Sequence, residues 1–195
     1  MNMAKKSSEL FANRKTIPDN LREVTLKALS FYPALKDVKI DFKYSRNIRT
    51  HFMQAQPRYT TMIGSRKRRS YIIKIRPEFC LKGREIPAHE LPPDVLVGWI
   101  GHELGHIMDY LRKNNLELLI FGIGYYTSKS FIITAERAAD TYALNHGLGD
   151  YILAAKDFIL NVADMSEKYI RRMNRLYLPP EEIMIMMDDI LAEAD

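Results

Sequence analysis

The chain has 195 residues, of which 47% are hydrophobic and 27% are charged, and its formal net charge is +5 at pH 7. This is ordinary globular composition, so collagen-like, low-complexity and wholly disordered classes are excluded. The one cysteine, Cys80, has no partner for an internal disulfide, which predicts a reducing compartment, the cytoplasm. The apolar runs fall far short of the ~20 residues that cross a bilayer, and no signal peptide is recognisable, so we expect no membrane span.

Charge is distributed unevenly along the chain. Residues 1–84 contain 20 Lys/Arg and 6 Asp/Glu, whereas residues 85–195 contain 9 Lys/Arg and 18 Asp/Glu. The densest positive cluster is the basic run of residues 66–69. We interpret this run as a solvated hairpin tip whose charges discourage edge-to-edge aggregation. Binding of nucleic acid by the basic half is the alternative, and the sequence leaves it open.

The first half of the chain predicts a short sheet. Residues 1–16 are polar and are expected to form a mobile arm ahead of a single domain, residues 17–195. A helix is expected over residues 18–30, because its apolar residues recur at helical spacing. Strands are then predicted over three segments: residues 38–44, 51–63 and 71–76.

Helical periodicity replaces strand alternation after a proline-rich loop. Asp94 is expected to cap a helix that runs to about residue 113, and Thr134 to cap another that Gly147 ends. Further helices are predicted for residues 116–126, for residues 152–175 and from residue 179 onward. The predicted fold class is α+β, with a small three-stranded sheet followed by a mostly helical half.

The strongest chemical signal is an HExxH motif on the helix that begins near Asp94: His102, Glu103 and His106. Residues four apart differ by about 40° around a helix, so both imidazoles can bind one Zn²⁺ at about 2.0–2.1 Å. Glu103 is placed to touch a water on the metal rather than the metal itself. Zinc lowers the pKa of such a water towards ~7, and the carboxylate takes the proton as the water attacks a carbonyl.

A catalytic zinc site needs a third protein ligand, and several residues are candidates. Asp109 lies one turn beyond His106, His146 lies at a predicted helix end, and Glu136 lies on the helix that Thr134 is expected to cap. A metzincin would have glycine at position 109 and histidine at position 112. These positions hold Asp109 and Arg112, so the metzincin class is excluded.

The HELGH motif followed by E-x-x-A-D, residues 136–140, resembles the gluzincin metallopeptidases, and among them the Ste24/HtpX-type peptidases and very small soluble gluzincins. The resemblance implies a zincin-like fold with HExxH on the active-site helix. It also implies that Glu136 is the third zinc ligand and that Asp140 supports His102. The spacing agrees, because Glu136 and Asp140 share one helix face and zinc-bound histidines usually donate their other N–H to a carboxylate. Alanines on this helix predict its close approach to the HExxH helix: residues 135, 138, 139 and 143.

Enzymes of this kind also need a group that stabilises an oxyanion, typically Tyr, His or Arg. The candidates are Tyr125, Tyr126, His146 and Tyr177, and no sequence rule selects among them. The expected function is a soluble zinc-dependent metalloendopeptidase that acts on a peptide or protein, with Glu103 as general base. A zinc-binding regulatory protein with little peptidase activity, or a DNA-associated protease that uses the basic half, is the alternative. The sequence does not predict an oligomeric state.

Overall fold

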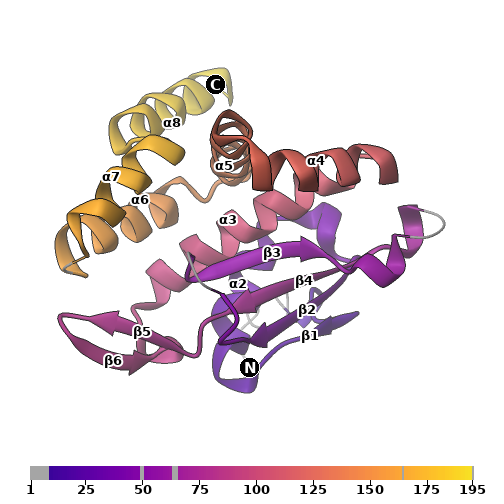
Figure 1. Ribbon diagram of the computed structural model, residues 1–195, viewed down its shortest axis with the longest axis horizontal. Helices are drawn as coiled ribbons and strands as arrows, with labels where there is room; N and C mark the ends of the chain where they lie inside the picture. The colour runs from indigo at the N-terminus through magenta and orange to yellow at the C-terminus, as the bar shows by residue number, and fades with distance from the viewer. Residues whose placement is uncertain (1–8, 49–50, 63–65, 164, 195) are drawn as a thin grey trace.

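The long helix α3 (Pro93–Arg112) lies between a sheet and a group of further helices (Figure 1). The computed structural model describes residues 9–48, 51–62, 66–163 and 165–194, without the side chains of Lys67, Tyr126 and Ala194. Within this part of the chain the class is α+β, as predicted. The HExxH motif therefore lies on the central helix, with the sheet on one side and the C-terminal helices on the other.

Four strands form the main sheet: β1 (Lys15–Thr16), β2 (Lys39–Tyr44), β3 (Met53–Pro57) and β4 (Ser70–Ile75). Their order is β1-β2-β4-β3, with β2 parallel to both β1 and β4, and β3 antiparallel to β4. The three predicted strands are present, but the prediction of a three-stranded sheet is wrong. β3 is an edge strand of this sheet and contacts α3.

Strand β1 lies inside the segment predicted to be a mobile polar arm. Lys15 and Thr16 pair with Ile40 and Asp41 of β2, and Phe11 packs against the hydrophobic core. The ordered elements of the domain therefore begin before residue 17. A polar pair of residues shows no alternation of apolar and polar positions, so no periodic signal marked this strand.

The proline-rich segment predicted as a loop contains a second, two-stranded sheet. β5 (Glu78–Leu81) and β6 (Arg84–Pro87) form an antiparallel hairpin. The two turn residues, Lys82 and Gly83, have φ values of 49° and 77°, and positive φ at both positions is what a type I′ turn requires. A Lys-Gly pair is a weaker hairpin signal than Asn-Gly, and the neighbouring prolines argued against strands.

The remaining helices are α2 (Arg22–Ser30), α4 (Asn115–Thr127), α5 (Lys129–Asn145), α6 (Gly149–Asp157), α7 (Glu167–Leu176) and α8 (Pro180–Ala194). Asp94 lies in the first turn of α3 instead of capping it, and Ser128, not Thr134, caps α5. The single helix predicted for residues 152–175 is wrong, because a π-helical turn (Phe158–Val162) follows α6 and separates it from α7. Within the described ranges no single helix is long and apolar enough to cross a membrane, and only α4 and α5 joined together, bent by 118°, meet that test.

Two helices approach the backbone of α3 directly. A Cβ atom on Gly105 would lie 2.4 Å from the carbonyl oxygen of Ala139 in α5, and one on Gly98 would lie 2.2 Å from that of Tyr151 in α6. Only glycine leaves room for such contacts. Three alanines of α5 are buried: residues 135, 139 and 143. The predicted close approach of this helix to the HExxH helix is confirmed.

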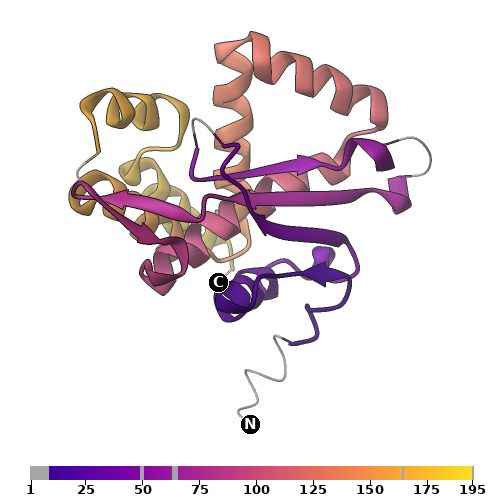
Figure 2. The same ribbon diagram turned by 60° about the horizontal axis from the view of Figure 1, so that its bottom comes forward.

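The C-terminal end of α3 is held by arginines of the basic run that precedes β4, which lies at the same end of the molecule (Figure 1, Figure 2). Arg69 is only 4% exposed and donates hydrogen bonds to the carbonyl oxygens of Tyr110 (3.1 Å) and Lys113 (2.8 Å). Arg66 donates to the carbonyl oxygen of Leu111. Cations are favourable at a helix C-terminus. The interpretation of the basic run as a solvated tip is therefore wrong for Arg69.

Candidate metal centre

Three side chains from two helices meet in one buried cluster: His102 and His106 from α3 and Glu136 from α5. Glu136 Oε2 lies 3.1 Å from His102 Nε2 and 3.4 Å from His106 Nε2. The three candidate ligand atoms all lie within 4.8 Å of one another. Ligand atoms about 2.05 Å from a tetrahedral zinc lie about 3.3 Å apart. The cluster therefore has donor types that can hold a metal ion, and both distances from Glu136 Oε2 are close to this value.

Gly105 explains why Glu136 reaches the histidines. It lies next to His106 on α3, and its missing side chain lets the α5 backbone contact α3 at Ala139, within one turn of Glu136. A wider separation of the helices would leave the carboxylate, on its short side chain, out of reach of the imidazoles. Helix packing, rather than a loop, brings the predicted ligands together.

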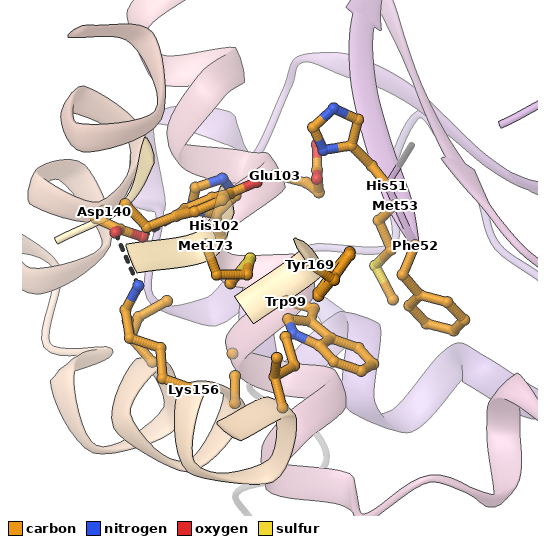
Figure 3. A pocket seen from close by; sticks show the side chains of 15 residues that line it. His51, Phe52, Met53, Trp99, His102, Glu103, Asp140, Lys156, Tyr169 and Met173 are labelled. Atoms are coloured by element: carbon orange, nitrogen blue, oxygen red, sulfur yellow. Dashed lines mark hydrogen bonds and ion pairs between the residues drawn. The ribbon is translucent and has the colours of Figure 1, made fainter. Parts of the chain in front are cut away.

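Asp140 lies one turn after Glu136 and holds His102 from behind. Its Oδ1 lies 2.8 Å from His102 Nδ1. Its Oδ2 accepts hydrogen bonds from Lys156 Nζ at 3.2 Å (Figure 3) and from the Leu178 N–H at 3.0 Å. Burial alone would raise the pKa of Asp140, but the Lys156 charge and the His102 hydrogen bond outweigh it and lower that pKa. Asp140 is therefore an ionised acceptor that lies against His102, at the position that the E-x-x-A-D pattern implied.

The histidines and the carboxylates of the cluster stabilise one another's charges. Burial lowers the pKa of His102, but hydrogen bonds and charges from Asp140 and Glu136 outweigh it and raise that pKa to about 10. Burial would raise the pKa of Glu136, yet the His106 charge and the hydrogen bonds from both histidines hold it well below its usual range. Metal binding displaces protons from such ligands. A divalent cation would replace the positive charge of the protons that leave the histidines. The residues of the cluster therefore fit such an ion.

Glu103 lies beside the cluster but outside the ligand group. Its Oε2 accepts the backbone N–H of Ala55, in the edge strand β3, at 2.5 Å. Burial raises the pKa of Glu103, and the charges of His106 and His102 act in the opposite direction. A fixed carboxylate with a raised pKa is suited to proton transfer near neutral pH.

A cleft of about 450 Å³ opens next to the cluster, between β3 and α4. His106 and Glu136 lie in its wall, together with apolar and aromatic side chains from α3 and α4. A smaller cavity of about 60 Å³ lies on the other side, next to Asp140 and Lys156. Glu103 borders both spaces, whereas His102 borders only the smaller one. A molecule in the cleft would therefore lie against His106, Glu136 and the HExxH acid.

Two of the candidates for oxyanion stabilisation lie at the site. The Tyr125 hydroxyl donates a hydrogen bond to Glu136 Oε1 at 2.5 Å. The Tyr177 ring lies 5.4 Å from the His102 ring, centre to centre. The side chain of Tyr126 lies outside the described residues. Tyr125 also borders the large cleft, which makes it the better placed of the two tyrosines for contact with a substrate.

The other candidates for the third ligand lie away from the cluster. His146 Nδ1 lies 2.7 Å from the Tyr142 carbonyl oxygen, and its ring stacks on that of Tyr32. Asp109 pairs with Lys113, the residue that follows the end of α3. The metal-ligand group found among the described residues contains Glu136 and neither of these. His146 is likewise not placed to stabilise an oxyanion.

His51 is a residue of the site that sequence reasoning missed. It precedes β3 and borders both the cleft and the smaller cavity (Figure 3). Burial lowers the pKa of His51 to about 4, so the ring is neutral at pH 7 and its Nε2 accepts a hydrogen bond from Arg172 at 3.2 Å. No motif or spacing relates His51 to the HExxH helix, so only the fold reveals it.

No protein-family model matches this chain, and comparisons with curated proteins and with solved structures find no match either. What the site does must therefore be argued from its own residues.

Proposed function

We propose that this protein is a zinc-dependent metalloendopeptidase of the gluzincin type, with a zincin-like fold. The observation that carries the proposal is the position of Glu136 Oε2, within 3.4 Å of both HExxH imidazoles. Two imidazoles and one carboxylate are a known ligand set of hydrolytic zinc enzymes, in which a fourth position stays open. The buried Asp140 behind His102 adds the supporting carboxylate that zinc-bound histidines commonly have.

Each residue of the site has a separate task in this proposal. His102, His106 and Glu136 hold the zinc, which when bound lowers the pKa of a water molecule and polarises a carbonyl group. Glu103 takes the proton of the water that attacks the peptide carbonyl and returns it to the leaving amine. The Ala55 N–H fixes one oxygen of Glu103, so the carboxylate keeps one orientation through both transfers.

The cleft favours an extended polypeptide as the substrate. It is bordered along its length by β3, an edge strand of the main sheet. Edge strands bind extended peptides by adding them to the sheet, with main-chain hydrogen bonds supplying affinity. The apolar wall from α4 includes Leu118 and Phe121, which suits a peptide with apolar side chains.

Glu103→Gln tests the proposal, because the amide keeps the shape of the side chain but cannot take up the proton. We expect this variant to retain about one zinc per chain, as a three-ligand site does, and to lose about 10²–10⁴-fold in the rate of peptide hydrolysis. Metal analysis of the purified protein and cleavage of a peptide library, read by mass spectrometry, measure the two quantities. Glu136→Ala is the matched control and is expected to lose the zinc. Turnover at the wild-type rate by Glu103→Gln would contradict the mechanism.

The same measurements address the first alternative, and a DNA-binding assay addresses the second. Wild-type protein that holds zinc but cleaves no peptide would favour a zinc-binding regulatory protein. Salt-dependent DNA binding would favour the DNA-associated protease. Two arginines of the basic run, Arg66 and Arg69, donate to carbonyl groups at the end of α3, so fewer of their N–H donors are free to bind DNA phosphates than the sequence suggests.

A further inference from the structure

A buried lysine lies behind the metal cluster. Lys156 of α6 is only 7% exposed, and its Nζ lies 3.2 Å from Asp140 Oδ2 (Figure 3). It borders the small cavity and not the large cleft. The ammonium group also lies 5.1 Å from the centre of the Tyr177 ring, within cation–π range. Lysine is almost never buried to this degree without a partner, and here its partner is the residue that orients a candidate metal ligand.

The two oxygens of Asp140 have different neighbours. Oδ1 faces His102 Nδ1, whereas Oδ2 receives Lys156 and the backbone N–H of Leu178. Lys156 is therefore the cation that compensates this buried carboxylate on the side away from His102. A buried charge without such compensation is costly, and the Leu178 N–H alone supplies a dipole but no charge.

We propose that Lys156 is a positioning residue of the metal site. It fixes the Asp140 carboxylate in one orientation, so that Asp140 Oδ1 holds His102 with Nε2 directed at the metal. The inference rests on the proposed function only in taking His102, His106 and Glu136 as metal ligands. Lys156 acts through Asp140 and touches neither the metal nor the substrate.

A direct electrostatic effect of Lys156 on the metal would have the opposite sign. Its positive charge repels a divalent cation, so a purely electrostatic role predicts tighter zinc binding once the charge is removed. Because the Asp140 carboxylate lies beside the ammonium, the two charges largely compensate each other towards the metal. The main contribution of Lys156 to metal affinity is then the orientation of His102 through Asp140. Loss of a hydrogen-bond partner that orients a metal ligand typically costs about 10–100-fold in metal affinity.

The test is the zinc affinity of folded full-length protein, measured by competition with a chelator. We expect Lys156→Met to weaken zinc binding about 10–100-fold and Lys156→Arg, which keeps the charge, to remain within about threefold of wild type. The small cavity beside Lys156 gives the arginine room. Lys156→Gln replaces the methionine variant if the latter does not fold. Lys168→Met, an exposed lysine on α7, and Leu153→Ala, on α6 but outside the cavity, are the controls for loss of charge and of packing.

A double-mutant cycle with Asp140→Asn shows whether Lys156 acts through Asp140. The double variant Asp140→Asn with Lys156→Met is expected to bind zinc within about threefold of Asp140→Asn alone. Additive losses, tighter zinc binding by Lys156→Met, or a lower melting temperature with unchanged zinc affinity would each overturn the inference. If wild-type protein binds no zinc, both the proposed function and the inference about Lys156 fail. If wild type and Lys156→Met bind zinc equally, this inference alone fails.

Discussion

Helices α3 and α4 follow each other in the chain and are both rich in apolar residues, yet their surroundings differ. α3 is buried along most of its length, including both histidines of the motif. α4 leaves a whole apolar stripe exposed at helical spacing: Leu116, Leu119, Ile120 and Ile123. Hydrophobic content therefore does not by itself decide how much of a helix is buried. The packing of neighbouring elements decides how much is buried. Glycines on α3 let α5 and α6 pack closely against it, whereas α4 forms one wall of the cleft.

One glycine from each helix illustrates this difference. A Cβ on Gly105 of α3 would meet the Ala139 carbonyl oxygen at 2.4 Å, whereas a Cβ on Gly122 of α4 would meet nothing within 4 Å. The same substitution, glycine to alanine, should thus have opposite effects on the two helices. α3 carries two of the candidate ligands and packs against the helix that carries the third. A substitution that disturbs this packing should therefore also weaken metal binding.

The largest effect is expected for Gly105→Ala. The added methyl group would push α5 away from α3, because a backbone carbonyl cannot move aside as a flexible side chain can. We expect a loss of about 3 kcal/mol in the free energy of unfolding together with weaker zinc binding, since Glu136 lies on the displaced helix. Urea unfolding and chelator competition measure the two quantities. Wild-type stability in this variant would show that the helices are not in such close contact.

An effect of intermediate size on stability is expected from the protonation of His51, which borders both the small cavity and the large cleft. Its pKa of about 4 is below the unfolded value of about 6.5, so the unfolded chain binds the proton more readily. The resulting stability is present above about pH 6.5 and is lost as the pH falls towards 4. We expect this contribution to reach about 1–3 kcal/mol, because the ring is partly exposed and the full shift is an upper bound.

His51→Asn provides the comparison for this pH dependence. The difference in unfolding free energy between wild type and variant, measured by urea unfolding in the presence of a chelator, should be larger at pH 7 than at pH 4.5. The carboxylates of the cluster titrate in both proteins, so the difference isolates His51. A difference that does not change with pH would show that His51 is not buried as a neutral ring.

The smallest effect, with the opposite sign, is expected for Gly122→Ala. Alanine is favoured over glycine inside a helix by about 1 kcal/mol, and no neighbouring atom opposes the methyl group. We expect the free energy of unfolding to rise by about 0.5–1 kcal/mol, measured by urea unfolding alongside Gly105→Ala. Destabilisation by this substitution would mean that α4 is packed as tightly as α3, and the comparison between the two helices would fail.

The local part of the site could be predicted from the sequence. The HExxH spacing fixes both imidazoles on one helix face, and the E-x-x-A-D pattern pointed to Glu136 and Asp140 on a second helix. The structure brings these residues together as expected, while the identity of the metal stays a prediction. Both signals are periodic within a helix, and helical periodicity is the most reliable information in a single sequence.

The remaining parts depend on contacts between distant segments. Ala55 meets Glu103 only because β3 is the sheet edge beside α3, and Lys156 meets Asp140 only because α6 packs on α3. No spacing encodes such encounters. The strand β1 was missed for a related reason, because a short polar strand carries little periodic signal and takes its conformation from a partner strand. The β5-β6 hairpin was missed because its Lys-Gly turn is a weak signal and the neighbouring prolines argued against strands.

The three donors to Asp140 have a consequence for the order in which the site is assembled during synthesis. They come from residues 102, 156 and 178, and a chain leaves the ribosome from its N-terminus. The HExxH helix emerges with two histidines and neither of the carboxylates that orient them or complete the ligand set. Only when the segment up to Leu178 has emerged can Asp140 gather its donors. The hydrogen-bonded support of His102 is therefore completed only after α7 has emerged, although the three candidate metal ligands all lie at or before residue 136.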